Sequence, residues 1–533
     1  MCLPVRARDI KCVLLGAIIV FTLMRLQVGP SLRTFNRRRV SGDLRAVSTT
    51  ARSNTTATSA TVDPFPGTWI DSPGNIHQRI FNFTLELEKL RFELWRKRNI
   101  APWKDVAPKE EIIVIDPNYG YYLRNLTAQP TAKVVFLRWR DAGRKPWSSV
   151  HDRSNILLSR YHQWAATKQL CEYITDKALV DLRWAFWPNC STRKADVFSP
   201  ISLHVQMLNH LDWVAALQNE GYTPESDLIQ PPPYVTYLTI LEDAVLSDKG
   251  SVVSGRLKVF PSSCQRRELR ALPVNYRSTP LYREVLSISQ RWAMMYYHGN
   301  IEMLPRIMPY LEFLKRNPTI KIHMGEIHTD FPLKMLKILG LDSTRVVKNA
   351  IRAKVVYLTQ GTTCGFMQPT NIQLMSDYMR TYSRNVLKSK ERNLVVMIRR
   401  TKSRSFTQAA EIEKMVANTV KKYNLTFVLY SDNPAPSLDE SIALFNRAVM
   451  IVAPHGAGLF NLIFTEPGTY VIEVVQSLPH VTMCYQRLAH VLGLRYYGEV
   501  AAGYNTIDMK PEKLKVAVEY FIHHAAKLRT TYT

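Results

Sequence analysis

From residue 391 to the C-terminus, short apolar runs alternate with segments in which apolar residues recur every three or four positions. The runs NLVVMI, TFVLYS, AVMIVA, TYVIEVV and LRYYGEV predict strands that are buried on both faces. Helices are predicted between them, at 409–422, 438–446 and 483–492, with a short one after residue 458 and a long one from residue 511. Strands alternating with helices indicate a parallel sheet covered on both faces.

A similar but less regular pattern occupies residues 233–390. YVTYLTIL and VVSGRLKVF flank a turn at 248–250 and predict a β-hairpin. TIKIHMG and KVVYLT predict further strands, and helices are predicted at 281–297, 305–315, 332–339 and 371–387. Together the two regions predict an α/β chain with two Rossmann-like domains facing a cleft, with ligands at the carboxyl ends of the strands.

The N-terminus carries an uncharged apolar run, CVLLGAIIVFTLM at 12–24, with basic residues on both sides. The run reaches residue 28 if Arg25 extends to the membrane interface. We expect a single-pass type II signal anchor at 12–28 after a cytoplasmic tail at 1–11. A cleaved signal peptide is the alternative, although no small-x-small cleavage site follows. With either a signal anchor or a cleaved signal peptide, the rest of the chain is expected to enter the lumen of the Golgi or endoplasmic reticulum.

Composition divides the remainder into a stem at 29–80, an N-terminal domain at 81–390 and a C-terminal domain at 391–533. The stem is predicted to be flexible because it is rich in Ser, Thr, Arg, Pro and Gly. FNFTLELEKLRFELWRK, which follows, has a helical pattern. Lumenal placement agrees with five N-x-S/T sequons, at Asn54, Asn82, Asn125, Asn189 and Asn424. Cys171 and Cys190 are close enough in sequence to form a disulfide.

The formal net charge of +26 favours anionic partners such as nucleotide diphosphates, acidic glycans or membrane surfaces. The basic residues are spread along the chain, with the densest cluster at 37–39, and no zinc-finger, RNP-type or helix-turn-helix signature accompanies them. Nucleic acid is therefore not an expected partner, and most basic side chains are expected to form a solvated surface.

The most informative segment is a predicted buried strand that runs into His455, Gly456, Ala457, Gly458 and Leu459 before a helix. Glycines let the backbone approach a ligand, and the helix N-terminus offers unpaired N–H groups and a positive dipole, which suit a pyrophosphate. A turn that needs glycine only for packing is the alternative. The histidine beside the glycines, at the strand's carboxyl end, favours the ligand site.

Charged residues occur at two further predicted strands of this domain. Arg399, Arg400 and Arg404 follow the run NLVVMI, where guanidinium groups would suit phosphate oxygens; a solvated basic loop is the alternative. Glu473 lies within VIEVV. A carboxylate at a strand's end accepts hydrogen bonds from ribose hydroxyls, whereas an edge or surface glutamate would have no such role.

A third candidate site lies in the N-terminal domain, in YYHGNIEMLPR. His298 and Glu302 are four residues apart and are neighbours if the segment is helical. Either side chain could deprotonate a hydroxyl in the cleft, and a core or capping role is the alternative. No G-x-S-x-G, Walker A or H-E-x-x-H motif occurs, which argues against an esterase, a P-loop kinase or a zinc protease.

In combination these motifs resemble glycosyltransferase family 61 over residues 233–500. The resemblance rests on Y-Y-H-x-x-x-E-x-L-P-R at 296–306, the arginines at 400 and 404, A-x-x-I-V-A-P-H-G-A-G-L at 448–459 and G-x-x-V-I-E at 468–473. It implies a GT-B fold and inverting, single-displacement transfer from a UDP-sugar, with xylose or N-acetylglucosamine as the sugar, to a glycan or glycoprotein acceptor.

The resemblance also assigns roles to the candidate residues. It implies that Arg400, Arg404 and the 455–459 loop bind the nucleoside diphosphate and that Glu473 binds the ribose. His298 and Glu302 would line the acceptor side. Divalent metal would not be essential and no other cofactor would be required, which agrees with the absence of a D-x-D motif from the sequence.

The chain departs from the family pattern at three positions. Gln408 stands where asparagine is usual, Phe460 where threonine is common, and Gly299 replaces the usual aromatic residue after the histidine. The last change is expected to enlarge or alter the acceptor pocket. A catalytically silent glycan-binding or scaffolding protein that retains the fold is the second hypothesis, and a polyanion binder, supported by charge alone, is the third.

Overall fold

The computed structural model divides the chain into two compact units, Met1–Val62 and Asp63–Thr533. The structure describes residues in the second unit, at 68–70, 75–98, 113–115, 126, 128–138, 235–261, 276–327, 329–361, 367–389, 391–476, 484–503 and 505–531. The expected tail and anchor, the Cys171–Cys190 pair and the sequons at Asn54, Asn125 and Asn189 lie outside these residues. Among the described helices, none is long and apolar enough to cross a membrane.

The C-terminal half contains a five-stranded sheet in the order β14-β12-β15-β16-β17, in which all neighbours are parallel. Its strands are β12 Leu394–Arg399, β14 Thr426–Ser431, β15 Ala448–Pro454, β16 Tyr470–Gln476 and β17 Arg495–Ala501. All five predicted strands are confirmed. Their apolar, β-branched sequences suit a sheet whose two faces are both covered.

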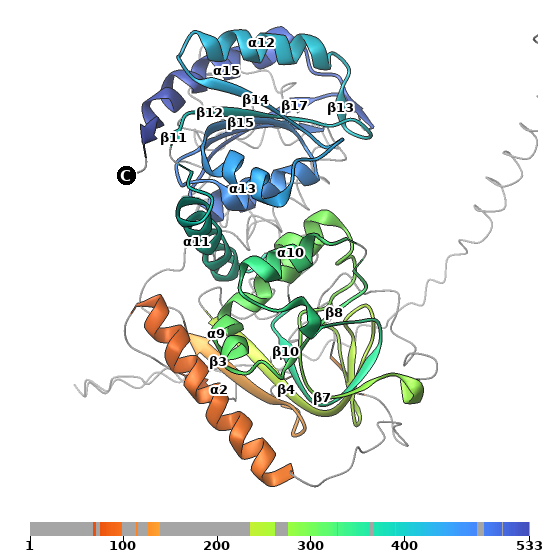
Figure 1. Ribbon diagram of the computed structural model, residues 1–533. Helices are drawn as coiled ribbons and strands as arrows, with labels where there is room; N and C mark the ends of the chain where they lie inside the picture. Colours follow the sequence, from red (N-terminus) through yellow and green to blue (C-terminus); the bar gives the residue numbers. More distant parts are fainter. Residues whose placement is uncertain are drawn as a thin grey trace, which may run out of the picture. The chain divides into compact units, whose positions relative to one another are not determined.

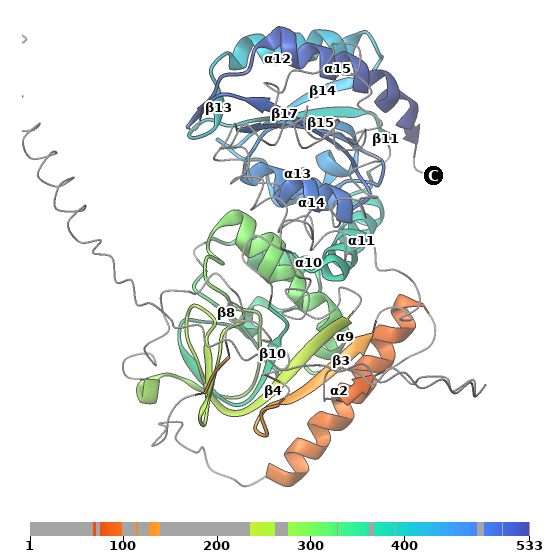
Figure 2. The ribbon, with the colours of Figure 1, turned by 180° about the vertical axis from the view of Figure 1, so that it is seen from behind.

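Helices cover both faces of this sheet (Figures 1 and 2). They are α12 Ala409–Lys421, α13 Leu438–Asn446, the 3₁₀ helix η8 Ala457–Phe464, α14 Cys484–Val491 and α15 Pro511–Ala525. Strand side chains alternate between faces. Met397 therefore packs in the core beside α12 and α15, whereas Ile398 belongs to the core on the opposite face.

The connections on either side of β12 run in opposite directions along the sheet. From β12 the chain passes through α12 to β14 on one side, and it returns through α13 to β15 on the other side of β12. The crevice beyond the carboxyl ends of β12 and β15 is therefore the topological switch point, where open parallel sheets bind ligands.

A ten-stranded sheet forms the other half, in the order β2-β6-β5-β4-β10-β7-β8-β9, with β3 paired to β4 and β1 to β3. The strands are β1 Thr68–Ile70, β2 Ile113–Ile115, β3 Lys133–Arg138, β4 Val235–Leu246, β5 Val252–Ser254, β6 Leu257–Val259, β7 Leu281–Ser287, β8 Lys321–Gly325, β9 Val346–Lys348 and β10 Ile351–Thr359. The part β10-β7-β8-β9 is parallel, whereas β4 is antiparallel to β3, β5 and β10. The sheet is thus mixed, and only its parallel part has the expected Rossmann-like arrangement.

The helix predicted at 281–297 is wrong in its first half, which forms β7. Leu281, Val285 and Ile288 recur at helical spacing, so the pattern alone favoured a helix. Pairing with β10 on one side and β8 on the other overrides that local preference. The chain then enters a π-helix, η5 His298–Met303, and a 3₁₀ helix, η6 Leu304–Tyr310.

The long helix α2 Ile76–Arg98 confirms the helical pattern and begins inside the segment expected to be stem. It is held to the sheet by Arg91, which donates to both carboxylate oxygens of Glu284 on β7, at 2.7 Å each. Burial alone would raise the pKa of Glu284, but the hydrogen bonds from Arg91 bring the pKa below its usual range.

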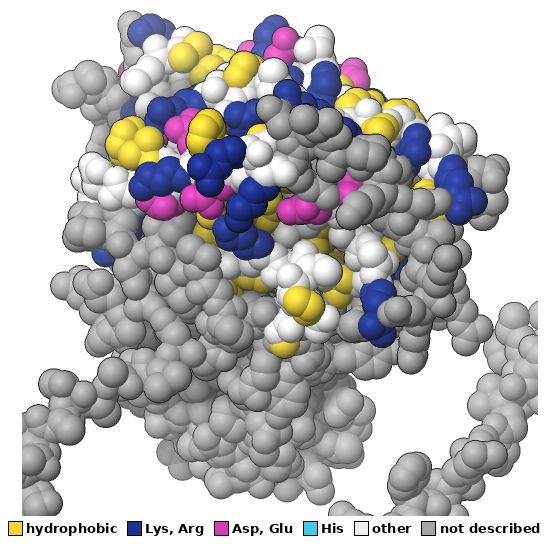
Figure 3. All heavy atoms as spheres, turned by 90° about the horizontal axis from the view of Figure 1, so that it is seen from below, with side chains coloured by type: hydrophobic (Ala, Val, Ile, Leu, Met, Phe, Trp, Pro, Cys, Tyr) yellow, Lys and Arg dark blue, Asp and Glu magenta, His cyan; other side chains and the backbone are white. Residues whose placement is uncertain are grey.

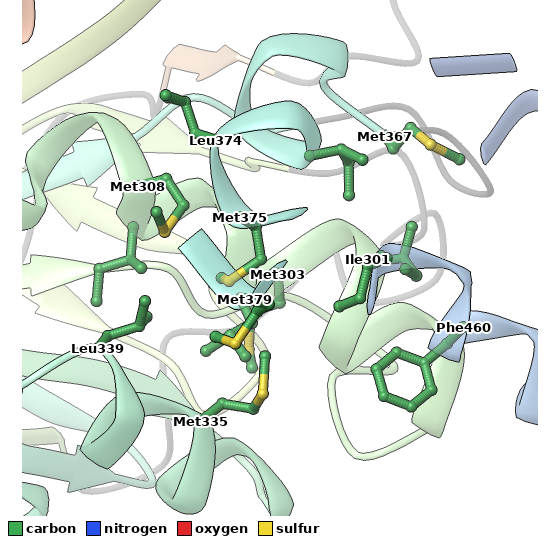
Figure 4. Packing of buried hydrophobic residues seen from close by; sticks show 14 of the residues in the cluster. Ile301, Met303, Met308, Met335, Leu339, Met367, Leu374, Met375, Met379 and Phe460 are labelled. Carbon is green, nitrogen blue, oxygen red and sulfur yellow. The ribbon is translucent and has the colours of Figure 1, made fainter. Parts of the chain in front are cut away.

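A methionine-rich part of the core lies where η5 and η6 meet α10 Phe331–Ile338, α11 Pro369–Asn385 and η8. Figure 4 shows these side chains gathered between the helices, with Phe460 of η8 nearby: Met303, Met308, Met335, Met375 and Met379. All of them belong to one buried cluster, so the two halves share a core. Methionine suits such a place because its unbranched side chain fills irregular gaps.

Candidate nucleotide-binding and catalytic site

Arg400 and the 455–459 loop meet at the switch point. Arg400 directly follows β12, and the loop follows β15, the neighbouring strand. A Cβ placed on Gly456 would lie 1.5 Å from Nη1 of Arg400 and 2.7 Å from its Cζ, so the guanidinium occupies that space. Gly456 has an extended backbone with φ of 160°, and glycine is needed there for space rather than for torsion.

The Arg400 guanidinium has buried donors without partners. Its Nη2 donates to Ser403 Oγ at 3.1 Å, but Nε and Nη1 are buried and have no hydrogen-bond partner among the described residues. Burial lowers the pKa of Arg400 and the charge of Arg404 lowers it further, while Asp432 and Tyr485 act in the opposite direction. Buried, unpaired donors are unfavourable, and an anion would satisfy them.

Arg404 adds a second positive charge to this place. Its backbone is in the left-handed region, with φ of 58°, and its N–H donates to the Asn505 carbonyl at 2.5 Å. Its half-buried side chain lies near enough to Arg400 to lower the pKa of that guanidinium, and near enough to Tyr485 to oppose the rise in the pKa of the phenol that burial causes. Two neighbouring cations repel each other, and a bound anion would relieve that repulsion.

Arg399 does not join them. It lies at the end of β12, where alternation turns it to the opposite face from Arg400. There its Nε donates to Glu413 on α12 at 2.6 Å, and its Nη2 pairs with the second oxygen of the same carboxylate. Of the three arginines in the predicted site, the structure brings only Arg400 and Arg404 together.

His455 and Glu473 form a buried pair behind the loop. His455 Nδ1 lies 2.5 Å from Glu473 Oε1, and Tyr496 on β17 donates its hydroxyl to Glu473 Oε2 at 2.6 Å. Glu473 has no exposed surface, and both its oxygens are engaged. In this geometry the carboxylate holds His455, and the predicted contact with ribose would require the residues that cover Glu473 to move.

His298 and Glu302 are also in contact. His298 Nδ1 lies 3.0 Å from Glu302 Oε1, although the approach is outside hydrogen-bond alignment in this structure. Glu302 is buried, and its Oε2 accepts a hydrogen bond of 2.9 Å from Gln290 Nε2. The His298 side chain keeps 21% of its surface exposed. A π-helix carries the pair, and such irregular turns are frequent at functional sites.

The structure corrects the expectation for Gly299. Its N–H donates to the Met295 carbonyl at 2.8 Å, and a Cβ at this position would lie 2.3 Å from the Ala293 carbonyl oxygen. The missing side chain therefore permits a close backbone approach and leaves no additional pocket volume.

Gln290 is a functional candidate that no sequence pattern marks, and it contacts Arg306, the last residue of the 296–306 motif. Arg306 is buried and donates to the Ile288 carbonyl at 3.0 Å, to Gln290 Oε1 at 3.3 Å and to the Thr359 carbonyl at 2.9 Å. It thus joins the carboxyl ends of β7 and β10. Because arginine can only donate, Gln290 must turn its carbonyl oxygen to Arg306 and its amide nitrogen to Glu302. Glu302 is therefore held as an acceptor.

A row of aromatic rings connects the two histidine–glutamate pairs. The ring of Tyr297 lies 5.4 Å from that of His298 and 5.5 Å from that of Tyr485, measured between centroids. Tyr485, at the start of α14, lies 5.3 Å from His455. No sequence pattern marks Tyr485, because its contacts are with residues far away in the sequence.

The neighbouring Tyr296 packs on the helix that follows the glycine loop. Its ring lies 4.7 Å from Phe460 of η8 and 5.2 Å from Phe331 of α10. The Tyr296–Tyr297 pair of the sequence motif therefore contacts the nucleotide-side elements, while His298 follows immediately along the chain.

On the face shown in Figure 3, Lys and Arg side chains (dark blue) are interleaved with acidic (magenta) and apolar (yellow) ones. Within the ranges that the structure describes, no group of three or more His, Cys, Asp or Glu could hold a metal ion.

The C-terminal half is a doubly wound α/β unit with two cations at its switch point, the place where open parallel sheets generally bind ligands. Residues 296–472 match the model of the family described as Glycosyltransferase 61, which supports the resemblance to that family. The match begins at the first tyrosine of YYHGNIEMLPR and ends one residue before Glu473. The match indicates a glycosyltransferase, a class of enzyme that in general terms uses a sugar donor and an acceptor.

Other comparisons add little. A rubredoxin:oxygen oxidoreductase from Desulfovibrio gigas is 11% identical with a TM-score of 0.20, over 44% of this chain and 52% of that one. A flavo di-iron protein mutant from Thermotoga maritima is 12% identical with a TM-score of 0.21, over 54% and 64%. The chain thus spans less than two thirds of these structures, and the likeness is too weak to bear on fold or function. No curated protein matches the chain.

Proposed function

We propose that this protein is an inverting glycosyltransferase of GT-B type that uses a UDP-sugar, with UDP-xylose or UDP-N-acetylglucosamine as the donor, and a glycan or glycoprotein acceptor. The observation that carries the proposal is the contact between Arg400 and Gly456 at the switch point. It supports an anion site built from a buried guanidinium with unpaired donors and a backbone loop that has no side chain in the way.

The diphosphate of the donor is proposed to lie against Arg400, Arg404 and the N–H groups at the start of η8. Arginine donors and a helix N-terminus both favour phosphate oxygens. As the bond between the sugar and the diphosphate breaks, negative charge grows on the departing UDP, and these groups stabilise it electrostatically. Because two arginines supply positive charge, we propose that a divalent metal is not essential.

We assign the base to His298 and the orienting role to Glu302. Glu302 is buried with one oxygen bonded to Gln290, whereas the imidazole reaches solvent. With Nδ1 held toward Glu302, Nε2 of His298 accepts the proton of the acceptor hydroxyl. That oxygen forms the new bond to the anomeric carbon, opposite the departing UDP, so the configuration inverts. The carboxylate then stabilises the imidazolium, as in other carboxylate–histidine pairs.

The proposed location is the lumenal side of the Golgi or endoplasmic reticulum membrane, with a type II anchor at 12–28. The apolar run with basic flanks supports it. So does the sequon at Asn424, which is exposed in the turn between α12 and β14.

The test compares neighbouring arginines in the purified full-length protein. UDP release is measured with UDP-xylose, UDP-N-acetylglucosamine and UDP-arabinose against a panel of glycan acceptors. Removing transition-state charge stabilisation typically lowers the rate about 100-fold or more, and we expect that loss in Arg400→Ala/Arg404→Ala. Arg399→Ala is the matched control, since Arg399 pairs with Glu413 on the other face. Undiminished UDP release in the double variant would overturn the phosphate assignment.

Binding separates the enzyme from a silent relative. A ligand that binds only the folded state raises the melting temperature. If none of the three UDP-sugars stabilises the wild-type protein, a catalytically silent glycan-binding protein becomes the better interpretation.

A further inference from the structure

The two histidine–glutamate pairs are not independent, because Tyr485 lies between them. Its side chain is 2% exposed and contacts His455 on one side and Tyr297 on the other. The planes of Tyr485 and Tyr297 are at 88°, and those of Tyr297 and His298 at 86°. Such edge-to-face contacts are the favourable geometry for aromatic pairs, so each ring restricts the orientation of the next.

Tyr485 also faces the cations of the proposed diphosphate site. Burial raises the pKa of Tyr485 and the charges of Cys484 and Glu473 raise it further, whereas Arg404 and Arg400 lower it. The phenol is thus within electrostatic range of both arginines. An anion that binds them changes the charge next to the hydroxyl of Tyr485, while the ring of Tyr485 contacts Tyr297.

We propose that Tyr485 is a positioning residue through which occupancy of the nucleotide site fixes the orientation of His298. The inference rests on the proposed function. The Nδ1 of His298 lies 3.0 Å from Glu302 Oε1 but outside hydrogen-bond alignment. A bound diphosphate holds Tyr485, Tyr485 holds Tyr297, and the imidazole then aligns with Glu302, so that the base forms only when a donor is present.

This arrangement has a chemical purpose. A base that is aligned without a donor bound does no useful work, so alignment is needed only when the donor occupies its site. Coupling between two sites is reciprocal, so a ligand that aligns His298 must itself bind more tightly when His298 is aligned.

The experiment measures the reactivity of His298 toward diethyl pyrocarbonate with and without UDP, by mass spectrometry of the modified peptide in the full-length protein. UDP affinity is measured in parallel by calorimetry so that each variant is saturated. In the wild type we expect UDP to slow the modification about fivefold or more, the usual lower range of coupling between sites. Tyr485→Phe keeps the ring and should retain most of this effect, whereas Tyr485→Leu should lose it.

Two further variants test whether the loss of the UDP effect is specific to the row of aromatic rings. Tyr297→Leu breaks the row at a half-buried position and should also abolish the effect of UDP, even if Tyr485→Leu fails to fold. Phe313→Leu removes an aromatic contact with Tyr357 in the other half and should leave the effect intact.

The outcomes distinguish the two proposals. If UDP does not bind the wild-type protein, the proposed function fails. If UDP binds but leaves the reactivity of His298 unchanged, or if the effect persists in Tyr485→Leu or Tyr297→Leu, the coupling is overturned and the proposed function stands.

Discussion

The guanidinium of Arg400 occupies the volume that a side chain at position 456 would need, with Nη1 1.5 Å from the place of a Cβ. Gly456→Ala must therefore displace Arg400 or the loop. We expect UDP affinity to fall at least about tenfold, equivalent to about 1.4 kcal/mol. The check is calorimetric titration with UDP.

Gly458→Ala is the matched control for that variant. A Cβ at Gly458 would meet only Ile398, at 3.1 Å from its Cγ2, and a small adjustment of that side chain can accommodate it. UDP affinity should stay within a few-fold of the wild type. Equal affinity in Gly456→Ala and wild type would contradict the role given to the Arg400–Gly456 contact.

The assignment of base and orienting group predicts unequal effects at His298 and Glu302. Loss of a positioned base typically lowers the rate by 10² to 10⁴, so His298→Ala should lower kcat by about that factor while the KM for the donor changes little. Glu302→Gln should lower kcat less, because the imidazole remains. Initial rates at saturating donor provide the measurement. A larger loss in Glu302→Gln than in His298→Ala would make Glu302 the base.

The buried side chain of His323 is expected to make the free energy of unfolding depend on pH. It is fully buried, and its Nε2 donates to the Asn349 carbonyl at 2.8 Å while Nδ1 accepts from Ser287 Oγ at 3.1 Å, so the ring is neutral. Burial lowers the pKa of His323 from 6.5 to about 4. Because the unfolded chain takes up this proton first, stability falls as the pH decreases from 6.5 toward 4, by about 3 kcal/mol in all.

Urea unfolding at several pH values between about 7.5 and 4.5 tests this expectation. His323→Gln should be less stable near neutral pH and should show a shallower decline on acidification. His523→Gln is the control, since His523 is exposed on α15. Identical slopes in wild type and His323→Gln would show that another group governs the acid sensitivity.

The sequon at Asn424 allows the proposed lumenal placement to be tested. Asn424 is exposed with φ of 54° in the turn after α12, and Thr426 opens β14. By contrast, Asn82 is in the middle of α2, where its Oδ1 accepts from Gln78 at 3.1 Å. We expect a glycan at Asn424, removed by glycosidase digestion and absent from Asn424→Gln. A mature protein with no glycan on any sequon would contradict lumenal placement.

The C-terminal sheet was predictable because its strands are short, apolar and β-branched and are separated by helices with clear periodicity. The strand β7 was not, since Leu281, Val285 and Ile288 fit a helix equally well and only pairing with β10 and β8 decides the outcome. Local pattern is strongest where each element is regular along its whole length.

The sequence predicts which residue types form the candidate site, but it does not predict which of these side chains contact one another. Arg399 and Arg400 are adjacent, and which of them faces the loop depends on where β12 ends, a matter of one residue. Tyr485 and Gln290 carry no local signal, because their partners come from other strands and helices. Glu473 could be recognised as a polar residue in an apolar strand, but its pairing with His455 required the register of β15 and β16.

The methionine-rich part of the core limits how this protein can be divided. Thioether side chains from α10, α11 and the η5–η6 segment lie in the same cluster as Phe460 of η8. A truncation between the two sheets would leave that surface facing water and prone to aggregation and sulfoxide formation. Chimaeras that exchange halves with a relative should therefore fail unless these thioethers are transferred as a set.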